Sequence, residues 1–124
     1  MHTHTGYSET DVIEGKEGGI VCNTSKWTEE PVLILWYRGE SGVPIYTVDG
    51  RNSSSLQKAQ QIPSSEFEGR AAFDPSHHPP TLAIKALFRE DDNEYRCRCD
   101  FRTSRTQNFL VNLTVIGKCL CVCV

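Results

Sequence analysis

Two cysteines and one tryptophan, at fixed separations, constrain this chain more than any other feature of its sequence. Trp36 follows Cys22 by 14 residues, and Cys97 follows Cys22 by 75 residues. Cys22 stands alone, whereas the other cysteines fall at positions 97, 99, 119, 121 and 123. We therefore expect a Cys22–Cys97 disulfide that joins distant parts of the chain. Because it closes a long loop, such a bond stabilises the fold by roughly 4 kcal/mol in chain-entropy estimates.

Short apolar segments separated by turn residues follow one another along the chain, as in an all-β protein. The strongest is VLILWY at 32–37, which is rich in β-forming residues. No segment keeps the i, i+3, i+4, i+7 apolar period of an amphipathic helix, and the polar residues 57–68 carry no strand pattern. We expect strands at 19–23, 32–37, 44–48, 70–73, 81–87, 94–101 and 109–116.

A tyrosine two residues before the second cysteine completes a pattern that is typical of one β fold. In an immunoglobulin-type sandwich two Cys join the facing sheets, a Trp packs on their bond, and a Tyr forms a corner beside the second Cys. The sequence matches this order, so we expect Trp36 and Tyr95 in the core. The extra length before Arg70 leaves room for an additional edge strand, which favours a V-type over a C-type domain.

These features predict one all-β domain, a V-type immunoglobulin-like β-sandwich with Greek-key topology at residues 9–116. A chain of 124 residues has room for one such domain of roughly 100 residues. The polar residues 1–8 are expected to be disordered. The Cys-rich residues 117–124 are expected to be a tail that results from truncation or read-through.

Cysteine content and glycosylation sequons indicate the secretory route. Six cysteines in 124 residues exceed what a reducing cytosol favours. Asn-X-Ser/Thr sequons begin at Asn23, Asn52 and Asn112, and Asn52 is the best candidate because it lies in a polar turn. The sequence has no signal-peptide pattern and no apolar run long enough to span a bilayer. We expect an extracellular domain that is either a fragment or a chain whose leader is missing.

Charge and motif content argue against enzymatic chemistry. The net charge of −3 lacks the basic excess that nucleic-acid binding normally needs. There is no Gly-X-Ser-X-Gly nucleophile elbow and no CxxC pair. We expect no catalytic residue, no cofactor and no metal, with His2, His4, His77 and His78 solvated. A metal-binding or acylated tract at 119–123 is the alternative to an artefactual tail.

The stretch DDNEYRC at 91–97 resembles the V-type motif Asp-X-Gly/Ala-X-Tyr-X-Cys, with Asn93 in place of the small residue. This resemblance implies a structural salt bridge between Arg70 and Asp91 at one end of the sandwich.

Longer stretches resemble the first immunoglobulin domain of the Sidestep family of arthropod cell-surface proteins. They are LILWYRGESGVPIYTVDGR, GRAAFD, EYRCRCDF and NFLVNLTVI, and the similarity runs from about Asp11 to Ile116. It implies a multi-domain, single-pass membrane protein of the nervous system that binds Beaten path family proteins and guides axons. The sequence departs from the family at Cys99, where an aliphatic residue is usual, and in its ending GKCLCVCV, where the family continues into a second immunoglobulin domain.

Strand alternation predicts a binding face on one sheet. If Trp36 points inward to the disulfide, the residues before and after it in the strand point outward. In the strand of Cys97, which also points inward, the residues on either side of that cysteine likewise point outward. Large apolar groups ringed by arginines then form a patch that marks an interaction site. The expected partner-binding residues are Leu33, Leu35, Tyr37, Arg96, Arg98, Asp100 and Leu110. A homodimer through the same sheet is also possible, and the alternative function is a secreted, stand-alone immunoglobulin protein that binds a soluble or microbial ligand.

Cys99 lies two residues after Cys97, so both side chains should point to the same side of the strand. We expect Cys99 to lie beside the disulfide as a buried free thiol that packs like a small apolar residue.

Overall fold

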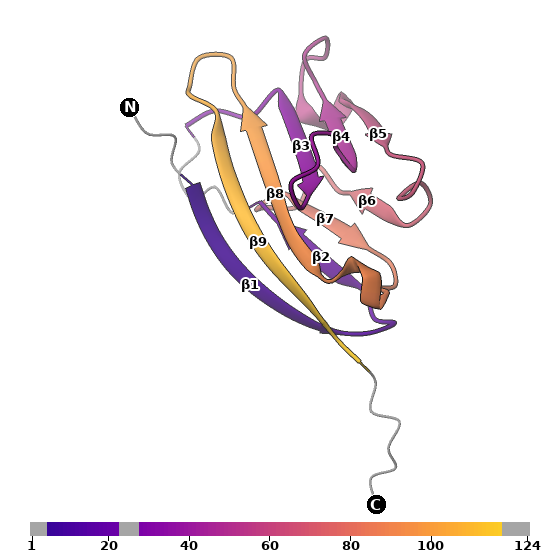
Figure 1. Cartoon of the computed structure of the whole chain (residues 1–124). Helices are drawn as coiled ribbons and strands as arrows, with labels where there is room; N and C mark the ends of the chain where they lie inside the picture. Colours follow the sequence, from indigo (N-terminus) through magenta and orange to yellow (C-terminus); the bar gives the residue numbers. More distant parts are fainter. Residues whose placement is uncertain (1–4, 23–27, 118–124) are drawn as a thin grey trace, which may run out of the picture.

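The computed structural model describes residues 5–22 and 28–117, and these form a sandwich of strands with two single 3-10 turns (Figure 1). The strands are β1 (Thr5–Ile13), β2 (Gly18–Val21), β3 (Leu33–Arg38), β4 (Tyr46–Asp49), β5 (Gln60–Pro63), β6 (Ala71–Phe73), β7 (Thr81–Ile84), β8 (Asn93–Asp100) and β9 (Gln107–Ile116). The 3-10 turns are η1 (Leu56–Lys58) and η2 (Arg89–Asp91).

The strands form two facing sheets, with the order β1-β9-β8-β3-β4-β5 in the larger and β2-β7-β6 in the smaller. The pairs are antiparallel, apart from the parallel pairing of β1 with β9. The prediction of an all-β, V-type immunoglobulin sandwich is confirmed. β5 is the additional edge strand that distinguishes the V-type, and it lies in a segment where the sequence showed no strand pattern.

The prediction that residues 1–8 are disordered is wrong for residues 5–8. β1 begins at Thr5 and pairs with β9 over its whole length, from Thr5 opposite Asn108 to Ile13 opposite Ile116. Gly6 is the first inward residue of this strand, and a Cβ at this position would lie 2.2 Å from the ring of Phe109. The ring of Phe109 occupies the space that a side chain at position 6 would fill, and the next inward residues, Ser8 and Thr10, are polar. The strand therefore shows no apolar alternation before Val12, which packs against the core. Residues 1–4 and 118–124 lie outside the described residues.

The core forms around the predicted disulfide, which is confirmed between Cys22 and Cys97 with a Cα–Cα distance of 5.6 Å. Trp36 is fully buried, and its ring centre lies 5.6 Å from that of Phe73 and 6.3 Å from that of Tyr46. The alternation predicted for the last strand is also confirmed, because its inward residues are the buried Phe109, Val111, Leu113 and Val115.

A buried ion pair holds the end of the sandwich nearest η2. Arg70 donates a hydrogen bond of 2.6 Å to Asp91, which is 1% exposed and also accepts one from the backbone N–H of Phe88. The Tyr95 hydroxyl donates to the carbonyl oxygen of Asp91 at 2.6 Å, which is the expected tyrosine corner. Burial, followed by the charge of Asp91, raises the pKa of Tyr95 to about 12. Arg70 also lies 5.2 Å from the ring centre of Phe67.

Candidate protein-interaction surface

The outer face of the six-stranded sheet brings the predicted partner-binding residues together. Strand register places Tyr37 opposite Arg96, and Arg96 opposite Leu110 on the next strand. One row further along the sheet, Leu35 lies opposite Arg98. The remaining two predicted residues, Leu33 and Asp100, form the row beyond that one. All seven residues therefore share one face, which we call the outer face together with its neighbours on β1, β4 and β5.

Tyr37 points to the outer face but is not an exposed part of it. Its exposed fraction is only 8%, because the guanidinium of Arg96 lies over its ring, 4.4 Å from the ring centre. The three predicted leucines, Leu33, Leu35 and Leu110, are half-buried. The predicted apolar patch is therefore only partly open, because the side chain of Arg96 shields the ring of Tyr37.

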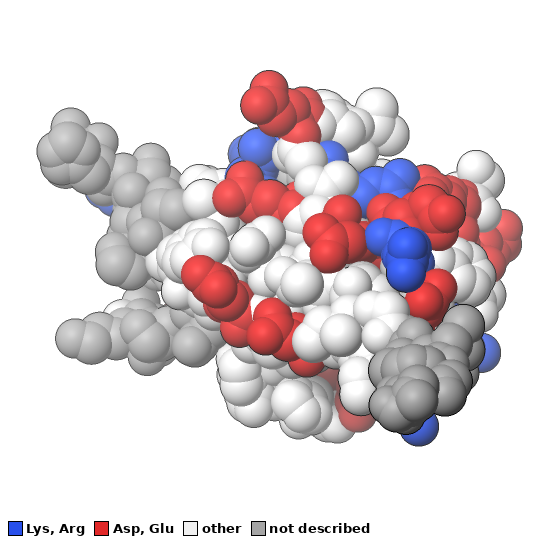
Figure 2. Space-filling view, turned by 60° about the horizontal axis from the view of Figure 1, so that its bottom comes forward, with Lys and Arg blue, Asp and Glu red and all other residues white. Residues whose placement is uncertain are grey.

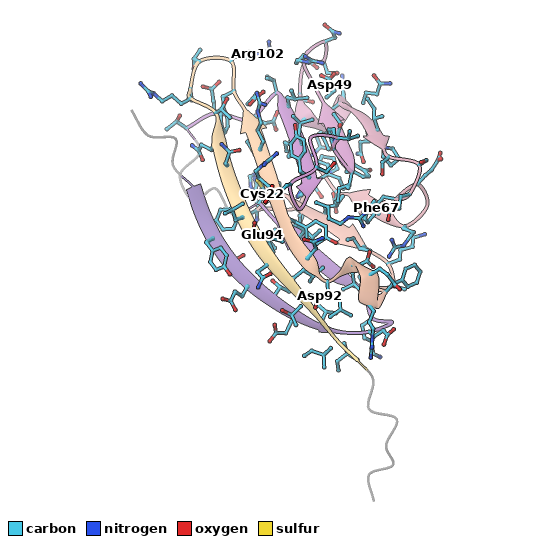
Figure 3. All side chains as sticks on the ribbon, in the orientation of Figure 1. Cys22, Asp49, Phe67, Asp92, Glu94 and Arg102 are labelled. Carbon is cyan, nitrogen blue, oxygen red and sulfur yellow. A yellow bond between two sulfur atoms is a disulfide. The ribbon has the colours of Figure 1, made fainter. Side chains whose placement is uncertain are left out.

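Two other arginines near the loop end of the outer face, Arg98 and Arg51, are also held in place by neighbours. Arg98 donates to both carboxylate oxygens of Asp100, at 3.0 and 3.2 Å, and the Thr106 hydroxyl donates to the same carboxylate. Arg51 donates to both oxygens of Asp49, at 2.9 and 2.7 Å. Hydrogen bonds from Arg51 lower the pKa of Asp49 to about 2. Figure 3 shows Asp49 at the loop end of its strand, on the same side of the domain as Arg102.

The sequence analysis missed exposed apolar residues of the outer face, among them one on each edge strand beside the predicted patch. Tyr7 on β1 is 54% exposed and lies opposite Leu110, while Ile62 on β5 is 44% exposed and lies opposite Thr47. They occupy the two edge strands, in segments that the sequence analysis read as disordered or without pattern. The period-two alternation of Tyr7 and Glu9 with smaller residues is the signal that could have found the first of them.

The loops at the upper end of the sheet are joined by carboxylates. Glu29, between β2 and β3, accepts hydrogen bonds from the backbone N–H and the hydroxyl of both Thr103 and Ser104, between β8 and β9. Hydrogen bonds from Ser104 and then Thr103 lower the pKa of Glu29 to about 2. Glu30 accepts a hydrogen bond of 2.9 Å from the backbone N–H of Leu56, between β4 and β5. Glu29 and Glu30, which are adjacent in the loop between β2 and β3, therefore hold two other loops, the one between β8 and β9 and the one between β4 and β5.

The three sequons differ in their surroundings. Asn52 is exposed in the turn after β4. Asn112 is half-buried on the outer face, in a row between Glu9 and Glu94. Asn23 lies outside the described residues.

Within the described part of the chain, one group of side chains has the composition of a metal site. The sulfur atoms of Cys22, Cys97 and Cys99 lie within 4.8 Å of one another. Two of these sulfurs are bonded to each other, and the third belongs to the buried thiol of Cys99. Burial raises the pKa of Cys99 to about 12. One protonated thiol beside a disulfide is a poor metal ligand, because metals bind the thiolate.

The two sheets, the Cys22–Cys97 bond on Trp36 and the tyrosine corner define a V-type immunoglobulin domain. The family model of the immunoglobulin V-set domain matches residues 5–116, and the chain belongs to this family. V-set domains are typical of cell-surface recognition and adhesion, are generally extracellular binding modules, and usually bind protein partners rather than catalyse reactions.

Comparison with solved structures agrees with this family. The chain is similar to the solution structure of the first Ig-like domain of the human CD48 antigen, with a TM-score of 0.74 and 18% sequence identity. The alignment covers 100% of this chain and 92% of that one, and at this identity the likeness shows the fold alone. No curated protein sequence matches the chain. None of the described residues forms a helix with the length and apolar character needed to cross a membrane.

Proposed function

We propose that this domain is a cell-surface recognition and adhesion module that binds another immunoglobulin-superfamily protein through the outer face. The resemblance to the Sidestep family makes a Beaten path family protein the proposed partner and axon guidance the proposed process. In this proposal the whole protein is a glycosylated, single-pass membrane protein, and the V-type domain displays its outer face to a partner on another cell.

The observation that carries this proposal is the way the arginines of the outer face are held around half-buried leucines. Arg96 lies on Tyr37, and Arg98 is bound by Asp100, so neither side chain has to be ordered when a partner arrives. Pre-organised side chains lose less conformational entropy on binding, and Arg and Tyr are favoured at interface hot spots. Leu35 lies next to Arg98 and supplies apolar area at the centre.

The test is surface plasmon resonance with Beaten path family ectodomains as the probes. Leu35→Asp and Arg96→Ala should each weaken binding by about 2 kcal/mol, which is roughly 30-fold. Tyr37→Ala should weaken it by a similar amount, because the ring that positions Arg96 is lost. Lys85→Ala is the matched control, since Lys85 is exposed and follows β7 of the opposite sheet. Unchanged affinity in well-folded Leu35→Asp and Arg96→Ala variants would remove this face from the proposal, with circular dichroism as the folding check.

A homodimer through the outer face is the competing use of the same surface. Sedimentation of the isolated domain separates the two, because only a homodimer gives a concentration-dependent mass without a partner.

A further inference from the structure

The outer face of the β1–β9 ribbon is exposed and has a composition of its own. Because β1 and β9 are parallel and in register, the outward residues of β1 lie directly beside those of β9. Every outward residue of β1 from Tyr7 onward is exposed. The outward residues of this ribbon are Tyr7, Glu9, Asp11 and Ile13 on β1, and Asn108, Leu110, Asn112, Thr114 and Ile116 on β9.

Large apolar side chains stand at both ends of this ribbon. Tyr7 lies beside Leu110 at one end, and Ile13 lies beside Ile116 at the other. Tyr7, Ile13 and Ile116 are 54%, 48% and 46% exposed, so they contribute little to the core. Apolar groups that remain in water on a sheet face and are flanked by polar residues mark an interaction site.

Carboxylates occupy the space between these apolar ends. Glu9 lies opposite Asn112, which lies opposite Glu94 on β8, and Asp11 lies one row further along. Among the described residues, none of the three carboxylates forms a salt bridge with Lys or Arg. Figure 3 places Glu94 away from Asp49 and Arg102 at the loop end. In Figure 2, acidic side chains are spread over the visible face, where basic side chains are fewer.

These carboxylates have no basic partner, although Glu9 accepts a hydrogen bond of 3.2 Å from the Tyr7 hydroxyl. Three arginines in or beside the same sheet are instead held within the domain. Arg96 lies on Tyr37, Arg98 is bound by Asp100, and Arg51 is bound by Asp49. A second copy that docked through its own outer face would therefore have to break the contacts of these arginines to offer them to the ribbon. A different protein with free basic side chains complements the ribbon without this cost.

We propose that the β1–β9 ribbon is the part of the binding face that selects the partner by charge, and that it takes a protein surface with Lys or Arg side chains between two apolar contacts. This inference rests on the proposed recognition function and deepens it by naming the chemistry of the partner. The basic side chains of the partner would lie over Glu9, Asp11 and Glu94, and its apolar groups would cover Tyr7 at one end and the Ile13–Ile116 pair at the other.

The experiment compares two double variants that remove the same charge. Glu9→Gln/Glu94→Gln neutralises the ribbon, and Glu17→Gln/Glu68→Gln neutralises two exposed carboxylates that precede strands of the opposite sheet. Binding of Beaten path family ectodomains is measured by surface plasmon resonance between about 50 and 300 mM salt. The ribbon variant should slow association by on the order of tenfold at low salt and flatten the salt dependence, whereas the control should match the wild type within about twofold.

The outcomes separate this inference from the proposed function. If Leu35→Asp abolishes binding and the two double variants behave alike, the outer face binds the partner but the ribbon does not select it, and the inference is overturned. If no ectodomain of the panel binds the wild-type domain, the proposed function fails and the inference fails with it. If the domain self-associates and Glu9→Gln/Glu94→Gln abolishes that association, the occupant is a second copy and the inference is likewise overturned.

Discussion

The sulfur atom of Cys99 lies 3.2 Å from that of Cys22, although the disulfide joins Cys22 to Cys97. Cys99 and Cys97 point to the same side of β8, and their sulfurs are 3.9 Å apart. The core thus contains one disulfide in contact with one free thiol. Burial, followed by the charge of Asp100, raises the pKa of Cys99 to about 12. Because thiol–disulfide exchange requires a thiolate, this raised pKa disfavours exchange of the native bond with Cys99 at neutral pH.

Removal of Cys97 should redirect the disulfide rather than abolish it. In Cys97→Ala we expect a Cys22–Cys99 bond, because the Cys99 sulfur already lies in contact with that of Cys22 and faces the same core. The variant should fold with a stability below that of the wild type, since a truncated core side chain and a shifted bond both cost packing. Peptide mapping without reduction checks the pairing. Recovery of Cys22 and Cys99 as two free thiols in folded protein would contradict this expectation.

Alkaline pH should destabilise the domain through Cys99. The pKa is about 12 in the folded state, against a usual value of 9.0. The unfolded state therefore loses its proton first, so stability is complete below about pH 9 and falls as the pH rises above it. At pH 10 this difference is about 1.4 kcal/mol. Urea unfolding at pH 8 and pH 10 measures the loss in the free energy of unfolding. Cys99→Val is the control, and its free energy of unfolding should fall by about 1.4 kcal/mol less than that of the wild type over the same pH range. Equal changes in both proteins would show that Cys99 does not titrate on unfolding.

The sequence predicted the central strands well because their side chains must fill the core. Cys22, Trp36 and Cys97 are large or covalently linked groups whose spacing leaves few folds open, and the alternation around them gives the direction of each side chain on β3, β8 and β9. Alternation could not reveal how far a side chain is covered. Tyr37 points outward as expected, but Arg96 shields it, and that contact depends on the register between two strands distant in sequence.

The edge strands could not be predicted for the opposite reason. The inward side chains of β1 are small or polar before Val12, and the four residues of β5 are Gln60, Gln61, Ile62 and Pro63, so neither strand shows the apolar alternation that indicates a strand. Their pairing is set by neighbours already in the sheet, namely β9 and β4. The exposed Tyr7 and Ile62 on these strands were therefore missed, although both belong to the candidate interaction surface.

Gly6 should be required for the docking of β1 on the sheet. A Cβ at this position would lie 2.2 and 2.3 Å from two atoms of the Phe109 ring, so Gly6→Ala forces the ring or the strand to move. We expect a loss of roughly 1–3 kcal/mol, the usual cost of overpacking a core. Gly42→Ala is the control, because a Cβ there meets nothing within 4 Å. Urea unfolding compares the two, and equal stability of both variants would contradict the close packing of Gly6 on Phe109.

Glu29 should control the mobility of the loop between β8 and β9 without controlling global stability. Glu29→Ala removes the acceptor shared by Thr103 and Ser104, so the amide protons of these two residues should exchange faster. Glu30→Ala is the matched control and should affect the amide of Leu56 instead. Since the pKa of Glu29 is lowered to about 2, the wild-type loop should keep these bonds at pH 5 and lose them only as the pH falls toward 2. Hydrogen exchange followed by NMR measures both effects, and unchanged exchange at Thr103 and Ser104 in Glu29→Ala would contradict the assignment.

Glycosylation should occur at Asn52 and leave the outer face free. Asn52 is exposed in the turn after β4, where a glycan can extend into solvent. A glycan on Asn112 would instead leave from the middle of the sheet, between Glu9 and Glu94, and would cover the β1–β9 ribbon. Glycopeptide mass spectrometry of material from insect cells should therefore find Asn52 modified, and Asn52→Gln should bind a Beaten path ectodomain as the wild type does. A glycan found at Asn112 but not at Asn52 would argue against both this ranking of the sequons and the use of the outer face for binding, because the partner could not approach the sheet past the sugar.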